Sequence, residues 1–99
     1  MAEYQVVLSS RAGRDIRVIE CHTRKSWGQD QASTYVESNW QTIESITTFP
    51  EIGRVVAVGP PSTRGIGVGR HIIFYRIGDS MIEISRIVHE RRDAAWLLE

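Results

Sequence analysis

This 99-residue chain has few cysteines, few lysines and no long apolar run, and these scarcities limit the kinds of structure it can form. The single cysteine, Cys21, excludes an internal disulfide and fits a reducing cytosol. No stretch approaches the roughly 18 apolar residues that a membrane-spanning helix requires. The N-terminal residues contain neither the basic region nor the apolar run of a signal peptide. We therefore expect a cytoplasmic protein.

The scarcity of lysine makes the positive charge almost entirely guanidinium. Eleven arginines and one lysine, Lys25, balance twelve acidic residues, so the formal net charge is zero. Guanidinium groups form planar, bidentate contacts with carboxylates and phosphates, which an ammonium group does not. An arginine-rich surface suits an anionic partner, either nucleic acid or an acidic peptide. A GC-rich genome would produce the same composition, so both interpretations stay open.

The length and composition predict one globular domain over residues 1–99, with 41% hydrophobic and 24% charged residues. No cofactor is expected. The three glycines of residues 64–69 alternate with other residues and precede a strand, unlike a phosphate-binding loop. His22 and His71 match no metal-ligand spacing with a carboxylate or cysteine, so no metal site is expected either.

Two helices are predicted after a short strand at residues 4–8. Over residues 11–27 the apolar positions recur every three or four residues, and Gly28 ends the pattern: Ala12, Ile16, Ile19, Thr23 and Trp27. Residues 30–48 carry a second stripe, which Pro50 terminates: Ala32, Tyr35, Val36, Trp40, Ile43, Ile46 and Phe49. The short connection predicts an antiparallel α-hairpin with Trp27, Tyr35 and Trp40 in the core, although the hairpin tip at residues 27–29 could instead expose an aromatic side chain.

The last third of the chain predicts strands. Residues 71–77 and 81–89 flank a Gly-Asp-Ser turn, residues 64–69 precede them, and residues 54–59 form a brief further strand. A short helix is expected from residue 91 or 92 to 98. The fold class is therefore α+β with two layers: an N-terminal strand, the α-hairpin, and a three-stranded antiparallel sheet, in the order β-α-α-β-β-β. The sheet face away from the helices is expected to be open.

The strand at residues 81–89 has no purely apolar side, so periodicity does not decide which side faces the helices. Arg76 and Arg86 both follow aliphatic residues, and each needs a partner if it is buried; Glu83 is a candidate partner for Arg76. His89-Glu-Arg-Arg-Asp93 could act in metal-free RNA cleavage, or could end a strand in surface ion pairs. Tyr75 could supply a hydroxyl group, or could belong to the core.

Several motifs, in order and at matching spacing, resemble ParE-type toxins of the RelE/ParE superfamily, which belong to bacterial toxin–antitoxin modules for plasmid stabilisation. They are Leu-Ser-Ser-Arg-Ala at 8–12, Asp-Ile at 15–16, Trp-Gly at 27–28, Gln-Ala at 31–32, Tyr35, Phe-Pro at 49–50, Ile-Gly at 52–53, Arg64, Gly-Arg-His-Ile-Ile-Phe-Tyr-Arg at 69–76 and Ile-Glu-Ile-Ser-Arg-Ile-Val-His-Glu-Arg-Arg-Asp at 82–93.

The resemblance implies a toxin that inhibits DNA gyrase, and hence replication, without catalysing a reaction. It also implies hetero-oligomers with a cognate ParD-like antitoxin, a ribbon–helix–helix protein whose C-terminal tail wraps the toxin. The partner-binding residues are predicted to be Arg64, Arg70, Arg76, Arg86, His89 and Arg91.

Two alternatives remain beside gyrase inhibition. The related RelE branch cleaves messenger RNA on the ribosome with several lysines and arginines and a late tyrosine. Here Lys25 is the only lysine, and Trp96 follows the basic cluster. A ribonuclease of this type would rely on His89, Arg91 and Arg86. The second alternative is an inactive module that only binds an antitoxin.

Overall fold

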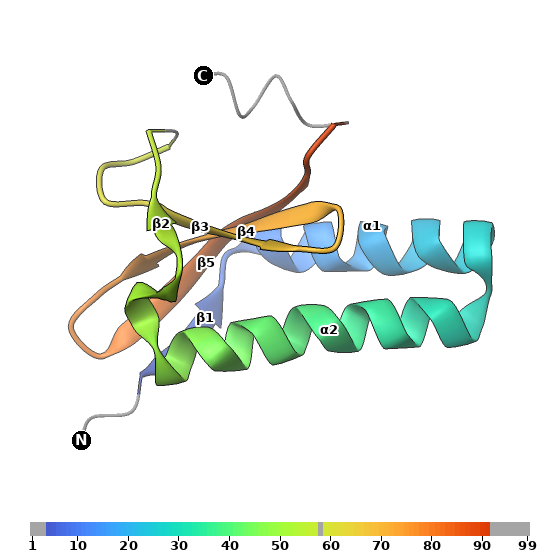
Figure 1. The fold of residues 1–99 in the computed structure, drawn as a ribbon, viewed down its shortest axis with the longest axis horizontal. Helices are drawn as coiled ribbons and strands as arrows, with labels where there is room; N and C mark the ends of the chain where they lie inside the picture. The colour runs from blue at the N-terminus through green and yellow to red at the C-terminus, as the bar shows by residue number, and fades with distance from the viewer. Residues whose placement is uncertain (1–3, 58, 92–99) are drawn as a thin grey trace.

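The computed structural model describes residues 4–57 and 59–91, which form a helical hairpin packed on one mixed sheet (Figure 1). In chain order the elements are β1 (Gln5–Leu8), α1 (Ser10–Trp27), α2 (Gln29–Thr48), the 3₁₀ turn η1 (Pro50–Ile52), β2 (Arg54–Val55), β3 (Arg64–Val68), β4 (His71–Ile77) and β5 (Met81–His89). The α+β class and both helices agree with the sequence prediction. The predicted C-terminal helix lies outside the described residues.

The sheet differs from the prediction in its strand count. It has five strands in the described part of the chain, in the order β1-β5-β4-β3-β2. The N-terminal strand joins this sheet as its edge, parallel to β5, with Gln5 opposite Met81; the other pairings are antiparallel. The α-hairpin is long enough to carry the chain across the sheet, which is what a parallel pairing requires.

The helical hairpin follows from its capping residues. The Ser9 hydroxyl accepts a hydrogen bond from the Ala12 N–H at 3.0 Å and so caps α1. Gly28 ends α1 with φ +93°, a conformation that favours glycine, and its N–H donates to the Arg24 carbonyl at 2.9 Å. The turn at Gly28 lies at the far end of the molecule from the β4–β5 hairpin (Figure 1). No helix of the described part is long and apolar enough to cross a membrane.

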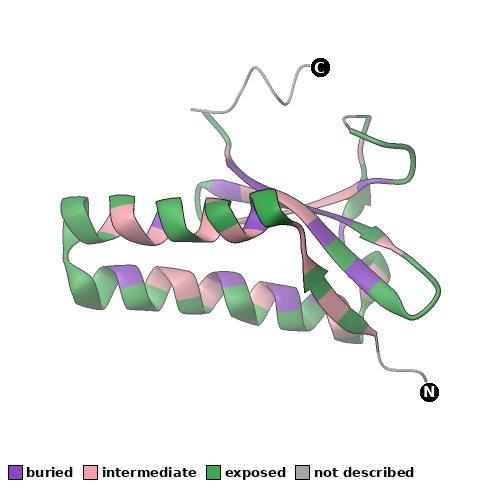
Figure 2. Ribbon diagram, turned by 180° about the vertical axis from the view of Figure 1, so that it is seen from behind, coloured by how far each residue is buried: buried purple, intermediate pink, exposed green. Residues whose placement is uncertain are grey.

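The core lies between the helices and one face of the sheet (Figure 2). Its members are Ala12, Ile19, Ile43, Ile46, Ile73, Tyr75, Ile82, Ile84 and Ile87. The prediction was wrong for Trp40, which is 44% exposed. Trp27 is 73% exposed, which agrees with the alternative of an exposed aromatic at the hairpin tip. Asn39 is buried instead: its amide Nδ2 donates to the Tyr35 carbonyl at 2.9 Å within α2, while its Oδ1 has no hydrogen-bond partner in the described part of the chain.

A β-bulge at Ser85 explains the mixed pattern of β5. Tyr75 lies opposite Ile84 and Phe74 lies opposite Arg86, so Ser85 is an extra residue on β5. Its hydroxyl donates to the Phe74 carbonyl at 3.1 Å. The bulge shifts the alternation by one residue. Apolar side chains on both sides of it, Ile84 and Ile87, therefore reach the same core.

The sheet face away from the helices is open only in part: Gly65, Gly67 and Ile72 line a hollow on it, while its centre is closed. Phe74 lies between the core residues Ile73 and Tyr75 and so points to this outer face, yet it is only 2% exposed. Val88, on the same face of β5, is fully buried.

Candidate functional site

The six predicted partner-binding residues do not form one surface. Arg70, His89 and Arg91 meet at the end of the sheet where β3 turns into β4. The Glu90 N–H donates to the Arg70 carbonyl at 2.9 Å, and the Arg91 N–H donates to His89 Nδ1 at 3.1 Å. The remaining three, Arg64, Arg76 and Arg86, lie elsewhere.

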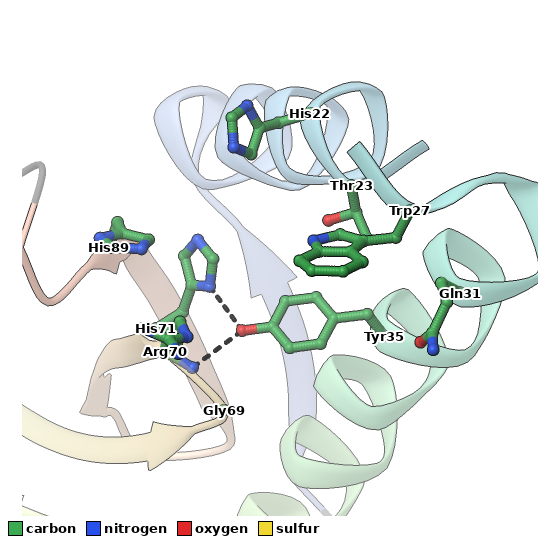
Figure 3. Close-up of a pocket in the computed structure, with 9 residues that line it drawn as sticks. All are labelled: His22, Thr23, Trp27, Gln31, Tyr35, Gly69, Arg70, His71 and His89. Carbon is green, nitrogen blue, oxygen red and sulfur yellow. Dashed lines mark hydrogen bonds between the residues drawn. The ribbon is translucent and has the colours of Figure 1, made fainter. Parts of the chain in front are cut away.

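A cavity of about 470 Å³ opens beside this cluster, between the helical hairpin and the β3–β4 turn (Figure 3). Helix α1 contributes one wall, α2 another, and the ends of β4 and β5 the third. The indole of Trp27 lies next to the ring of Tyr35 at the helical side (Figure 3). The lining residues are His22, Thr23, Trp27, Gln31, Tyr35, Gly69, Arg70, His71 and His89.

The Tyr35 hydroxyl ties the β3–β4 turn to α2. It accepts the Arg70 N–H at 3.0 Å, and it lies 2.6 Å from His71 Nδ1 and 3.3 Å from the Val68 carbonyl. The hydroxyl has one proton, so it donates either to Nδ1 or to the carbonyl while accepting from Nδ1–H; the His71 tautomer decides which. In both cases Tyr35 fixes the turn that carries Arg70.

Gly69 makes this contact possible. Its φ of +57° favours glycine, and a Cβ at this position would lie 2.5 Å from Cε1 of Tyr35. The sequence prediction did not include Tyr35 or His71 in the site. Gly69, just before the strand, was the one sequence signal of a close approach.

The cavity lining carries positive or neutral groups and no carboxylate. His71 is only 7% exposed, and its ring meets the ring of His89 edge-on, with centroids 5.1 Å apart. Arg70 adds a guanidinium, and His22 approaches from α1. Such a lining favours an anionic group of a partner. Within residues 4–57 and 59–91, no three His, Cys, Asp or Glu side chains are placed to hold a metal ion.

Arg86 has a structural partner on α1. Its Nε donates to Asp15 Oδ2 at 2.9 Å and its Nη2 to Oδ1 at 3.3 Å, and the two side chains are 14% and 17% exposed. The Ile87 N–H also donates to Oδ2, at 2.9 Å. Strand β1 pairs with β5 only as far as Ile84. Beyond that residue, the Asp15 carboxylate accepts the Ile87 N–H in place of a neighbouring strand. A direct contact of Arg86 with a partner stays a prediction.

Arg64 and Arg76 occupy two further places. The Arg64 Nη1 donates to the Gly53 carbonyl at 2.7 Å, which secures the segment after η1. Arg76 is exposed and lies opposite Glu83 near the β4–β5 hairpin, as the sequence suggested. Their roles in partner binding also stay predictions.

Tyr75 belongs to the core rather than to a catalytic site. Its hydroxyl donates to the Pro50 carbonyl at 2.6 Å and accepts the Gly53 N–H at 2.9 Å. Burial raises the pKa of this hydroxyl above its ordinary value. It is therefore a structural hydrogen-bonding group.

Residues 6–94 match the family described as the ParE toxin of the type II toxin–antitoxin system, parDE. The chain belongs to the ParE toxin family. It is 33% identical over 87 residues to the toxin ParE1 of Caulobacter vibrioides, a match that covers 88% of this chain and 90% of that protein.

Two solved structures share the fold of this ParE toxin. One is the chromosomal ParDE system from P. aeruginosa, with a TM-score of 0.76, 17% identity and coverage of 88% of this chain and 96% of that chain. The other is the RelBE2 toxin–antitoxin complex from Mycobacterium tuberculosis. Its TM-score is 0.63 at 20% identity, and the alignment covers 89% of this chain and 99% of that chain.

Proposed function

We propose that this ParE-type toxin of a type II toxin–antitoxin system arrests growth by inhibiting DNA gyrase in the cytoplasm. The family match over residues 6–94 is the observation that carries the proposal. The residues around the cavity support binding rather than bond cleavage. His71 is buried against Tyr35, and His89 Nδ1 accepts a backbone N–H, so neither ring resembles an exposed acid–base pair.

We further propose that a ParD-like antitoxin neutralises the toxin in a hetero-oligomer. The two solved relatives are described as a ParDE system and as a toxin–antitoxin complex, which supports this partner. An antitoxin tail with acidic side chains would find Arg70 and His22 at the cavity, with no opposing carboxylate in its lining. A folded toxin that binds such a tail gains stability by mass action.

One observation favours the second candidate, a ribosome-dependent ribonuclease. Arg70, His89 and Arg91 gather at one end of the sheet, where they could contact a phosphate and supply one imidazole. Arg86 does not join them, because it is bound to Asp15. The described residues thus provide only two of the three groups that this candidate requires.

Pulse labelling after induced expression separates these functions. If the toxin inhibits gyrase, incorporation of labelled thymidine falls before incorporation of labelled methionine. The reverse order, together with messenger cleavage that His89→Ala abolishes, would select the ribonuclease. Normal growth with folded protein present would select the inactive antitoxin-binding module. Co-expression of the antitoxin is expected to restore thymidine incorporation.

A further inference from the structure

The zero net charge conceals opposite charges on the two helices. Helix α1 holds five arginines and lysines and two carboxylates, which leaves it at +3. Helix α2 holds three carboxylates and no arginine or lysine, which leaves it at −3: Asp30, Glu37 and Glu44. The hairpin therefore places a positive helix beside a negative one. Of the two helices, only α1 attracts an anionic partner.

The positive charge of α1 lies on its exposed side. We define the basic face of α1 as five exposed residues: Arg11, Arg14, Arg17, Arg24 and Lys25. At 3.6 residues per turn Arg14 and Arg17 lie opposite the buried positions Ala12 and Ile19, and Arg24 and Lys25 flank them. Arg11 lies about a quarter turn from the buried side. The face extends over about 21 Å, since 14 residues separate its ends and each adds about 1.5 Å.

The two carboxylates of α1 compensate this face only in part. Asp15 is bound to Arg86 of β5. Glu20 pairs with Arg24 at 3.4 Å, but both side chains are 47% exposed, and such surface pairs contribute little. Within residues 4–57 and 59–91, no carboxylate lies within ion-pair distance of Arg11, Arg14 or Arg17.

The charge pattern is not what helix stability alone would select. The first turn of α1 has no acidic residue, and Arg11 occupies the positive end of the helix dipole. Cations at that end are unfavourable, whereas Arg24 and Lys25 in the last turn are favourable. A charge that opposes local stability suggests a function outside the fold.

We propose that the basic face of α1 binds the phosphate backbone of duplex DNA without reading its sequence. Protein interfaces need apolar anchors and are depleted of charge at their centre, whereas DNA-binding surfaces are strongly positive. The face offers one exposed apolar residue, Val18, among five cations. Between Arg11 and Lys25 there is no Phe, Tyr or Trp on which unpaired bases could stack, and the exposed Trp27 just beyond them lines the cavity instead. The cations cover about 21 Å of the helix length, which corresponds to about six phosphates of one strand.

This proposal is independent of gyrase inhibition, because it concerns the toxin and DNA alone. Fluorescence anisotropy with the purified full chain and a labelled 20-base-pair duplex tests it, between 50 and 200 mM salt. With up to five phosphate contacts, the logarithm of the binding constant should fall with the logarithm of salt concentration at a slope of about −4.5. A scrambled duplex should bind equally well.

Matched substitutions locate the contact. Arg17→Gln should weaken binding about eightfold at 0.1 M salt and reduce the slope by about 1, because one contact is lost. Arg54→Gln removes the same charge from exposed β2 and should change neither quantity. Glu37→Gln with Glu44→Gln raises the net charge by two on α2 and should strengthen binding less than twofold if α1 faces the DNA. Circular dichroism confirms that each variant is folded.

Three results would overturn the proposal. If Arg17→Gln and Arg54→Gln weaken DNA binding equally, the DNA does not bind specifically at the basic face of α1. Tighter binding of the single strand of the same length would exclude a duplex-specific geometry. Tighter binding of polyglutamate of equal charge would indicate an acidic protein as the partner instead.

Discussion

Asp15 on α1 binds Arg86 on β5 with two hydrogen bonds, across 71 positions of sequence, beyond the point where β1 stops pairing with β5. Arg86 is conspicuous in the sequence as a cation between isoleucines. The structure explains it as the anchor between the first helix and the last strand, and this anchor gives the first prediction.

Asp15→Ala should destabilise the toxin by about 2–3 kcal/mol, because it leaves a largely buried guanidinium and the Ile87 N–H without their acceptor. Chemical denaturation measures the change. Glu20→Ala is the matched control, since it removes an exposed ion pair from the same helix and should cost less than about 1 kcal/mol. Equal costs would show that the Asp15 contact is not the anchor described here.

Two glycines two positions apart should respond differently to alanine. Gly69→Ala should cost at least about 2 kcal/mol, because its φ of +57° strains an L-residue and the new Cβ would meet the Tyr35 ring. Gly67→Ala meets nothing within 4 Å and should leave stability unchanged or raise it by about 0.5 kcal/mol. Thermal unfolding of both variants is the measurement. If Gly69→Ala leaves the unfolding temperature unchanged, the close contact of Tyr35 with the turn is contradicted.

The raised pKa of Tyr75 predicts a loss of stability at alkaline pH. The unfolded tyrosine ionises near pH 10, while the buried hydroxyl keeps its proton to higher pH. The folded state therefore binds more protons above pH 10, and the free energy of unfolding falls until the folded pKa is passed.

Tyr75→Phe is the test of this alkaline effect. At neutral pH the variant should lose about 1–3 kcal/mol, because the Gly53 N–H loses its acceptor. Above pH 10 its stability should fall less steeply than that of the parent. Parallel curves would mean that Tyr75 titrates normally.

Substitutions of Arg70 and Arg64 should affect different quantities, the affinity for the antitoxin and the free energy of unfolding. Arg70→Ala should weaken antitoxin binding with little change in unfolding, because the fold uses only the Arg70 backbone. Arg64→Ala should cost about 1–3 kcal/mol, because its guanidinium secures the Gly53 carbonyl. Calorimetric titration with the antitoxin tail and chemical denaturation measure the two effects. A normal affinity of Arg70→Ala would remove the cavity from the proposed interface.

The helices could be predicted from sequence because local signals specify them: the Ser9 cap, Gly28 and Pro50. The failure at β5 has a non-local cause. The bulge at Ser85 reverses the alternation of β5 and made its core side undecidable from periodicity. The apolar pattern of α2 includes Trp40 and omits the polar Asn39, although Asn39 is the buried residue of the two.

The candidate site was predictable only in part. Arg70, His89 and Arg91 were identified and do lie together. Tyr35 was missed because its contact with His71 spans 36 positions of sequence and depends on how α2 packs against the β3–β4 turn. Arg86 was grouped with the others because its partner, Asp15, lies in a different element.

The most direct test of the proposed function is the supercoiling of relaxed plasmid by purified DNA gyrase and ATP, with increasing amounts of the toxin. The proposal predicts that supercoiling decreases as the toxin is added, that pre-bound antitoxin restores it, and that Arg70→Ala raises the amount required. Full supercoiling at a large excess of folded toxin would contradict the proposal.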